Sequence, residues 1–166
     1  MIVEDRKNGY MIELPEGWQE RKGKFGTLSH HSILFGLIGD KHYFESADGR
    51  SRLTVSAGAN IWPSPLIRKA AMCDFLVFNV FLELKETDLT EIEGFCLGGE
   101  ENTVYYWYES PHGSGRFISA VRDGREYTLR TSVVKDDDTL EKDDEIEGII
   151  ASFRFLEPGN AECSSR

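Results

Sequence analysis

The chain has 166 residues, of which 40% are hydrophobic and 29% charged, and its formal net charge is −10. This length fits one domain with a substantial core, and the composition is that of a globular protein rather than a disordered or fibrous one. The acidic balance repels phosphate backbones and anionic lipid, so it argues against binding to nucleic acid or to a membrane surface. The same charge favours neutral or basic protein partners.

The first part of the chain predicts short strands joined by turns. Tyr10, Ile12 and Leu14 alternate with other residues before "PEGW" at 15–18, which is typical of a strand that ends in a proline-led turn. Two further β-like runs follow at 24–30 and 32–39. Asp48 and Gly49 then lie between two strand-like runs, and Asp-Gly in this position predicts a β-hairpin.

The segment "PLIRKAAMCDFLVFNVFLEL" changes to a helical pattern. Ser64 is a suitable N-cap and Pro65 suits the first helical position, so we predict a helix over about 65–84. Residues 75–84 are also rich in β-branched and aromatic side chains, and a central strand is the alternative there. The helical pattern predicts a wide buried face made of Leu66, Ala70, Cys73, Val77, Val80 and Leu84.

The second half predicts an antiparallel meander of four strands, at 91–99, 102–110, 115–122 and 125–134, separated by glycine-containing turns. The aromatic run "VYYWY" lies in the second of these strands. A period of two places Val104, Tyr106 and Tyr108 on one face and Tyr105 and Trp107 on the other. Because both sets are bulky, we expect both faces of this strand to be covered.

The acidic segment near the C-terminus predicts a helix over about 139–152. Asp138 and Glu141 have the spacing of a capping arrangement, and acidic side chains there stabilise the positive end of the helix dipole. Ile146, Ile149 and Ile150 mark the stripe that we expect to be buried.

These elements predict a single domain over 1–156. A short extended segment at 153–155 leads into a tail at 157–166 that we expect to be frayed. The most apolar run, at 75–84, is about half the ~20 residues that a membrane crossing needs.

The three cysteines, Cys73, Cys96 and Cys163, are odd in number and far apart, with no CxxC pair. This pattern argues against a disulfide framework and against a zinc ribbon, and it favours reduced thiols. The charged N-terminus lacks the order of a signal peptide. We therefore expect a cytoplasmic protein, with Cys73 and Cys96 packed in the core.

The sequence contains no convincing catalytic or cofactor motif. The four histidines, His30, His31, His42 and His112, form no helical HxxxH or Cys-His spacing, so no metal site is expected. No glycine-rich nucleotide loop and no GxSxG elbow occurs. We expect no cofactor and no enzymatic activity.

Three segments carry a family resemblance: "IELPEGW" at 12–18, "LGGEENTVYYWY" with "FISAVRDGREYTLRTS" at 97–108 and 117–132, and "IEGIIASFRFL" at 146–156. In this order they resemble the Mog1/PsbP-like superfamily, including its bacterial DcrB-like branch. The resemblance implies an α+β fold with a central antiparallel sheet of about six or seven strands flanked by helices. Members of the family are mostly non-enzymatic, and include a Ran GTPase-binding factor, photosystem II assembly subunits and chaperones of type VI secretion effectors.

The resulting expectation is a non-catalytic domain that binds another protein, as an adaptor, an effector chaperone or an immunity-type factor. Trp62, Tyr105 and Trp107 are the candidate partner-binding residues, because aromatic side chains are common anchors in interfaces. One alternative is a small-ligand-binding protein or enzyme in which His112, Glu109 and Arg116 converge only in three dimensions. Another alternative is a homo-oligomer that buries the apolar face of the helix at 65–84 between subunits.

Overall fold

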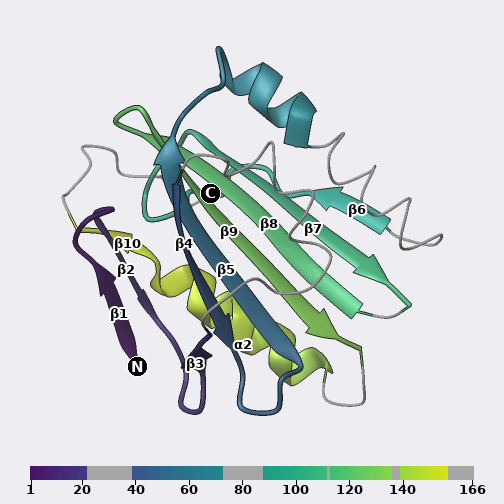
Figure 1. The fold of residues 1–166 in the computed structure, drawn as a ribbon. Helices are drawn as coiled ribbons and strands as arrows, with labels where there is room; N and C mark the ends of the chain where they lie inside the picture. Colours follow the sequence, from purple (N-terminus) through teal and green to yellow (C-terminus); the bar gives the residue numbers. More distant parts are fainter. Residues whose placement is uncertain (22–38, 73–87, 112, 136–138, 157–166) are drawn as a thin grey trace.

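The computed structural model describes residues 1–21, 39–72, 88–111, 113–135 and 139–156. Within these ranges the chain forms two antiparallel sheets and two helical segments (Figure 1). The strands are β1 (Ile2–Asp5), β2 (Tyr10–Glu13), β3 (Gln19–Glu20), β4 (Gly39–Glu45), β5 (Ser51–Ala59), β6 (Asp88–Glu91), β7 (Thr103–Ser110), β8 (Gly113–Arg122), β9 (Arg125–Val134) and β10 (Arg154–Phe155). The helical segments are α2 (Thr139–Ser152) and residues 65–72, here called helix 65–72.

The large sheet has seven strands in the order β3-β4-β5-β9-β8-β7-β6. Strands β6 to β9 are neighbours in the sheet in sequence order, and β7, β8 and β9 correspond to the last three strands of the predicted meander. Asp48 and Gly49 make the predicted hairpin between β4 and β5, where Gly49 has a φ of 71°. Asp123 and Gly124 turn β8 into β9, with φ values of 50° and 74° that match the positive-φ turns of two-residue hairpins.

The two faces of the large sheet carry different cores. On one face, α2 packs over alternate side chains of the central strands, and its Ile146, Ile149 and Ile150 are buried as predicted. On the opposite face, Met72 of helix 65–72 is buried with side chains of β7 and β8. The core under α2 includes Phe44, Leu53, Val55, Tyr105, Ile118, Leu129 and Val133, and the smaller core under helix 65–72 includes Val104, Tyr106 and Phe117.

The aromatic run of β7 lies between these two cores. Tyr105 is 6% exposed in the core under α2, and Tyr106 is 4% exposed in the core under helix 65–72. The prediction that both faces of this strand are covered is therefore confirmed.

The small sheet has the order β1-β2-β10 and was not expected as a separate unit. Tyr10, Ile12 and Leu14 alternate as predicted, and all three are buried against the core under α2. The predicted exit segment forms β10, which pairs with β2. In Figure 1 this sheet stands beside α2, at the β3–β4 side of the large sheet.

Two predictions about local structure were wrong. The strand expected at 91–99 ends at Glu91, because Gly94, Gly98 and Gly99 have φ values of 74°, 59° and 87° and turn the chain away from the extended path. The buried face of the helix that begins at 65 was also misplaced. Leu66 is 75% exposed and Ala70 is exposed, whereas the fully buried side chains are Arg68 and Met72.

Several predictions fall outside the described residues: the β-like runs at 24–30 and 32–39, the part of the predicted helix after residue 72, the cap residue Asp138 and the tail at 157–166. Among the helices of the described ranges, none is long and apolar enough to cross a membrane.

Candidate functional site

The three predicted partner-binding aromatics do not form one surface. Tyr105 and Trp107 extend from β7 toward α2, and Trp62 lies on the other side of the large sheet, next to the core under helix 65–72. Tyr105 is buried and Trp107 is partly buried against the same core. A partner could therefore reach Trp62 without contacting the other two.

Tyr105 and Trp107 belong instead to a polar cluster that attaches α2 to the sheet. Arg116, whose side chain is 6% exposed, donates from Nη1 to Asp143 and from Nε to Glu147, each at 2.7 Å. Burial alone would lower the pKa of Arg116, and the bonds to Glu147 and Asp143 outweigh it and raise that pKa. The Arg116 guanidinium also lies 5.8 Å from the centre of the Trp107 ring.

The Tyr105 hydroxyl completes this cluster by donating to Glu147 Oε1 at 3.0 Å. Burial, together with the nearby Glu147 carboxylate, raises the pKa of Tyr105 to about 12. These contacts join Asp143 and Glu147 of α2 to Tyr105 and Arg116 of the sheet, so the cluster anchors α2.

Trp62 belongs to a largely exposed apolar area, here called the 61–67 surface and defined by Ile61, Trp62, Leu66 and Ile67. Ile61 is 51% exposed, Leu66 is 75% exposed and Ile67 is 49% exposed. The four side chains follow one short stretch of chain that enters helix 65–72. Large apolar side chains concentrated in this way mark interaction sites more often than single exposed ones do.

Hydrogen bonds hold this stretch in place. Trp62 Nε1 donates to Glu126 Oε2 at 3.0 Å, and Ser119 Oγ donates to the other oxygen of that carboxylate at 2.7 Å. Ser64 caps the helix as predicted, because its Oγ accepts from the Ile67 amide at 3.3 Å.

The inner side of helix 65–72 is fastened by a buried arginine. Arg68 Nη2 donates to the side-chain oxygen of Asn102 at 2.7 Å and to its backbone carbonyl at 2.9 Å. Burial lowers the pKa of this guanidinium. Because Arg68 and Met72 occupy the inner side, Leu66 and Ile67 are turned outward.

Of the alternative catalytic group, the structure describes Glu109 and Arg116. Both Nε and Nη1 of Arg116 are committed to α2, and Glu109 pairs with Lys135 at 3.4 Å on the exposed surface. His112 lies outside the described residues.

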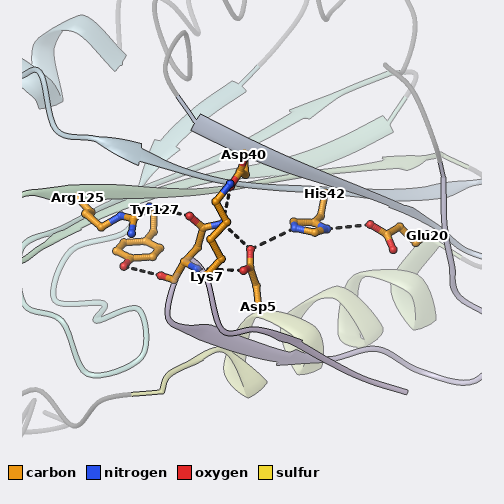
Figure 2. A network of polar contacts seen from close by, with 8 residues as sticks. Asp5, Lys7, Glu20, Asp40, His42, Arg125 and Tyr127 are labelled. Carbon is orange, nitrogen blue, oxygen red and sulfur yellow. Dashed lines mark hydrogen bonds and ion pairs between the residues drawn. The ribbon is translucent and has the colours of Figure 1, made fainter.

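A second polar cluster joins the small sheet to the large one, and Figure 2 shows its residues. Asp5 ends β1, and Asn8 lies in the tight turn that follows, where it is 3% exposed. Arg125 of β9 donates to Asn8 Oδ1 at 2.6 Å, and the Tyr127 hydroxyl donates to the Asn8 carbonyl at 2.9 Å. The turn is thereby fixed to the centre of the large sheet.

His42 of β4 occupies the middle of this cluster. Its Nε2 lies 3.2 Å from Asp5 Oδ2 and its Nδ1 lies 2.8 Å from Glu20 Oε1, as Figure 2 shows. Burial alone would raise the pKa of Asp5, and the Asn8 hydrogen bonds and the His42 ring outweigh it and lower that pKa. Two residues along β4, Asp40 pairs with Lys7 at 2.6 Å.

Sequence reasoning missed this second cluster. Asp5 and His42 are 37 positions apart, and Asn8 and Tyr127 are 119 positions apart. No local spacing could signal such contacts. Within the described residues, no three His, Cys, Asp or Glu side chains are arranged to hold a metal ion.

Cys96 is disulfide-bonded, which corrects the expectation of a reduced core thiol. It is also only partly buried, in the turn-rich segment that follows β6. The widely spaced cysteines gave no sign of this bond, because a disulfide depends on distance in the fold and not on spacing in the sequence.

Comparison with solved structures identifies the fold. The solution structure of cyanobacterial PsbP (CyanoP) from Synechocystis sp. PCC 6803 matches with a TM-score of 0.62 over 93% of this chain and 91% of that one, at 16% identity. The crystal structure of the Saccharomyces cerevisiae Ran-binding protein Mog1p matches with a TM-score of 0.58 over 95% of each chain, at 6% identity. The chain has the Mog1/PsbP-like fold.

The fold prediction is therefore confirmed, including the α+β class and the antiparallel sheet. No protein-family model matches the chain, and no curated protein matches it in sequence. At these identities the Mog1/PsbP-like fold fixes the scaffold and leaves the function to be argued from the surface.

Proposed function

We propose that this Mog1/PsbP-like domain is a non-catalytic protein-binding module whose contact area is the 61–67 surface. The observation that carries the proposal is the exposure of Ile61, Leu66 and Ile67 beside the partly buried Trp62. Aromatic side chains, and Trp in particular, are enriched at the centres of protein interfaces. The description of Mog1p as a Ran-binding protein supports a binding role for this scaffold.

The backbone of the 61–67 surface is held in place before a partner binds. Glu126 holds the Trp62 indole, and Arg68 and Met72 fix the rotation of helix 65–72. Because the backbone is already ordered, docking of a partner loses less conformational entropy. More of the contact free energy then contributes to the affinity.

The partner is a different protein with a neutral or basic surface. The chain carries a formal net charge of −10, so two copies repel each other. This disfavours the homo-oligomer alternative. The expectation of a cytoplasmic location rests partly on reduced thiols, and the disulfide at Cys96 removes that support.

A photo-crosslinking experiment tests the proposal. The crosslinkable residue p-benzoylphenylalanine is placed at Leu66 and, as a matched control, at Val134, which is 53% exposed at the end of β9. In the native lysate we expect one dominant protein adduct from position 66 and none of the same mass from position 134.

The double substitution Leu66→Asp with Ile67→Asp provides the second arm. Since both side chains face solvent, the thermal midpoint should stay close to that of the parent, while retention of the crosslinked protein on an affinity column falls at least tenfold. Equal retention by parent and double variant would exclude the 61–67 surface as the contact area.

A further inference from the structure

Four polar side chains form one patch on β5 and β9, two neighbouring strands in the middle of the large sheet. The register pairs Thr54 with Arg130 and Ser56 with Thr128. On each strand the two residues are two positions apart, so all four side chains lie on the same face of the sheet. Leu129 is buried in the core under α2, so these four residues, here called the β5–β9 polar patch, lie on the opposite face.

The polar patch has no partners of its own. Within the described residues, Arg130 is partly buried and makes neither an ion pair nor a hydrogen bond. The hydroxyls of Thr54, Ser56 and Thr128 also lack a hydrogen-bond partner there. Ser56 is 9% exposed and Thr128 is 8% exposed. A buried polar group that the chain itself leaves unpaired is costly unless another molecule bonds to it.

The charged side chains around the polar patch do not neutralise Arg130. Arg52 of β5 donates to Glu45 of β4 at 3.1 Å, and Glu126 already accepts two hydrogen bonds from other side chains. Lys41 of β4 lies on the same face, opposite β5. Among the described residues of this region, positive groups therefore outnumber negative ones, although the chain as a whole has a formal net charge of −10.

This arrangement fits a carboxylate. A guanidinium can donate two parallel hydrogen bonds to a carboxylate or a phosphate, and each hydroxyl can donate one more to an anionic oxygen. Arg130 supplies one unpaired permanent charge, which matches the single negative charge of a carboxylate. The acidic chain repels a doubly charged phosphate more strongly than a singly charged group.

The burial of the hydroxyls limits the size of the ligand. A flat protein surface cannot reach side chains that are more than nine-tenths buried, whereas a small molecule can. We propose that the β5–β9 polar patch binds the carboxylate group of a small organic anion, with Arg130 as the charged contact and Thr54, Ser56 and Thr128 as hydroxyl donors. This inference does not depend on the 61–67 surface, which other residues form.

An NMR titration with acetate as the probe tests the inference. The side-chain Nε–H signal of Arg130 is the direct reporter, and its loss in Arg130→Lys identifies it. pH and ionic strength are held constant. Because so small a ligand makes few contacts, we expect a saturable shift with a Kd of about 1–10 mM. Inorganic phosphate, titrated in the same way, should bind more weakly than acetate.

Two arginine variants of equal charge provide the matched comparison. Arg130→Gln should weaken acetate binding about tenfold or more, as followed by the backbone amides of Thr54 and Thr128. Arg6→Gln removes the same charge from the turn after β1, where the Arg6 side chain is 84% exposed, and should leave the Kd unchanged. Since Arg130 has no partner to lose, the thermal midpoint of Arg130→Gln without acetate should stay close to that of the parent.

Thr128→Val tests the hydroxyl contacts. Valine keeps the shape of threonine and removes its hydroxyl, so the Kd for acetate should rise roughly threefold. The inference is overturned if acetate causes no saturable shift at concentrations about tenfold above the expected Kd range. It is also overturned if Arg130→Gln binds acetate as tightly as Arg6→Gln does, or if phosphate binds more tightly than acetate.

Discussion

The Tyr108 hydroxyl reaches across β8 and donates to the Thr131 carbonyl of β9 at 3.2 Å. It passes over Gly115, where a β-carbon would lie 2.2 Å from the Tyr108 hydroxyl oxygen and 2.5 Å from the Thr131 carbonyl oxygen. The pairing of β8 with β9 is interrupted at the same place, between Ser114 and Phe117. Gly115 therefore allows Tyr108 and β9 to pack closely against β8.

Gly115→Ala should destabilise the protein. The new methyl group overlaps the backbone oxygen of Thr131 as well as Tyr108, and a backbone atom of a central strand cannot move aside freely. We expect a loss of about 1–3 kcal/mol in the free energy of unfolding, measured by urea titration. Gly148→Ala is the matched control, since a β-carbon at this site in α2 meets no atom within 4 Å.

The control should gain about 0.5–1 kcal/mol, because alanine favours a helix interior over glycine. If Gly115→Ala were as stable as the parent, the close contact of Tyr108 with this strand would be wrong. An unchanged m-value in both variants would show that the substitutions change stability and not the surface exposed on unfolding.

The anchor beneath α2 predicts unequal roles for its two acids. Asp143 Oδ1 accepts from Arg116 at 2.7 Å and from Ser114 Oγ at 2.9 Å, and its side chain is 19% exposed. Glu147 accepts from Arg116 and Tyr105, and its side chain is 49% exposed. Water can replace a lost contact more readily at the more exposed carboxylate.

Asp143→Asn should therefore cost about 1–3 kcal/mol of unfolding free energy, and Glu147→Gln should cost less, about 1 kcal/mol or below. Each substitution removes one negative charge, so the general effect of net charge cancels in the comparison. Chemical denaturation of the two variants side by side provides the measurement. A larger loss in Glu147→Gln would show that Arg116 depends mainly on Glu147, and equal losses would contradict the unequal roles.

The acid side of the stability curve depends on Asp5. The pKa of this carboxyl is lower in the folded protein than in the unfolded chain, despite the opposing effect of burial, because Asn8 and His42 favour its ionised form. A group of this kind stabilises the fold above its unfolded pKa of about 3.9 and loses that contribution as the pH falls through the folded pKa. Stability should therefore decline as the solution is acidified below about pH 4.

Asp5→Asn tests this dependence. The variant should be less stable than the parent near neutral pH, and the difference should shrink as the pH is lowered toward about 3. Urea midpoints measured at several pH values give the two curves. Parallel curves for parent and variant would mean that Asp5 is not responsible for any of the acid-induced loss.

Sequence patterns predicted the parts of this fold that depend on neighbours along the chain. Ile146, Ile149 and Ile150 lie on one side of a polar helix, so the buried stripe of α2 could be identified directly. The same pattern did not identify the buried side of helix 65–72, because its sequence is apolar on several sides. The side that is buried there carries Arg68, which binds Asn102 in a distant loop.

The candidate sites show the same division. Trp62 could be selected because an aromatic residue next to two prolines is visible in the sequence, but the exposure of Leu66 depends on how its helix docks. The residues around His42 come from four strands and one turn. Their meeting depends on the small sheet, which no local pattern indicated.

The disulfide at Cys96 gives the last prediction. Alkylation of the denatured, unreduced protein should leave Cys96 unmodified, because its sulfur carries no thiol hydrogen or negative charge. After reduction, the same peptide should carry the alkyl group. Peptide mass spectrometry before and after reduction measures both states, and full labelling of Cys96 before reduction would contradict the bond.

Cys96→Ser should also lower the unfolding free energy by about 2–5 kcal/mol, since the bond restricts the unfolded chain.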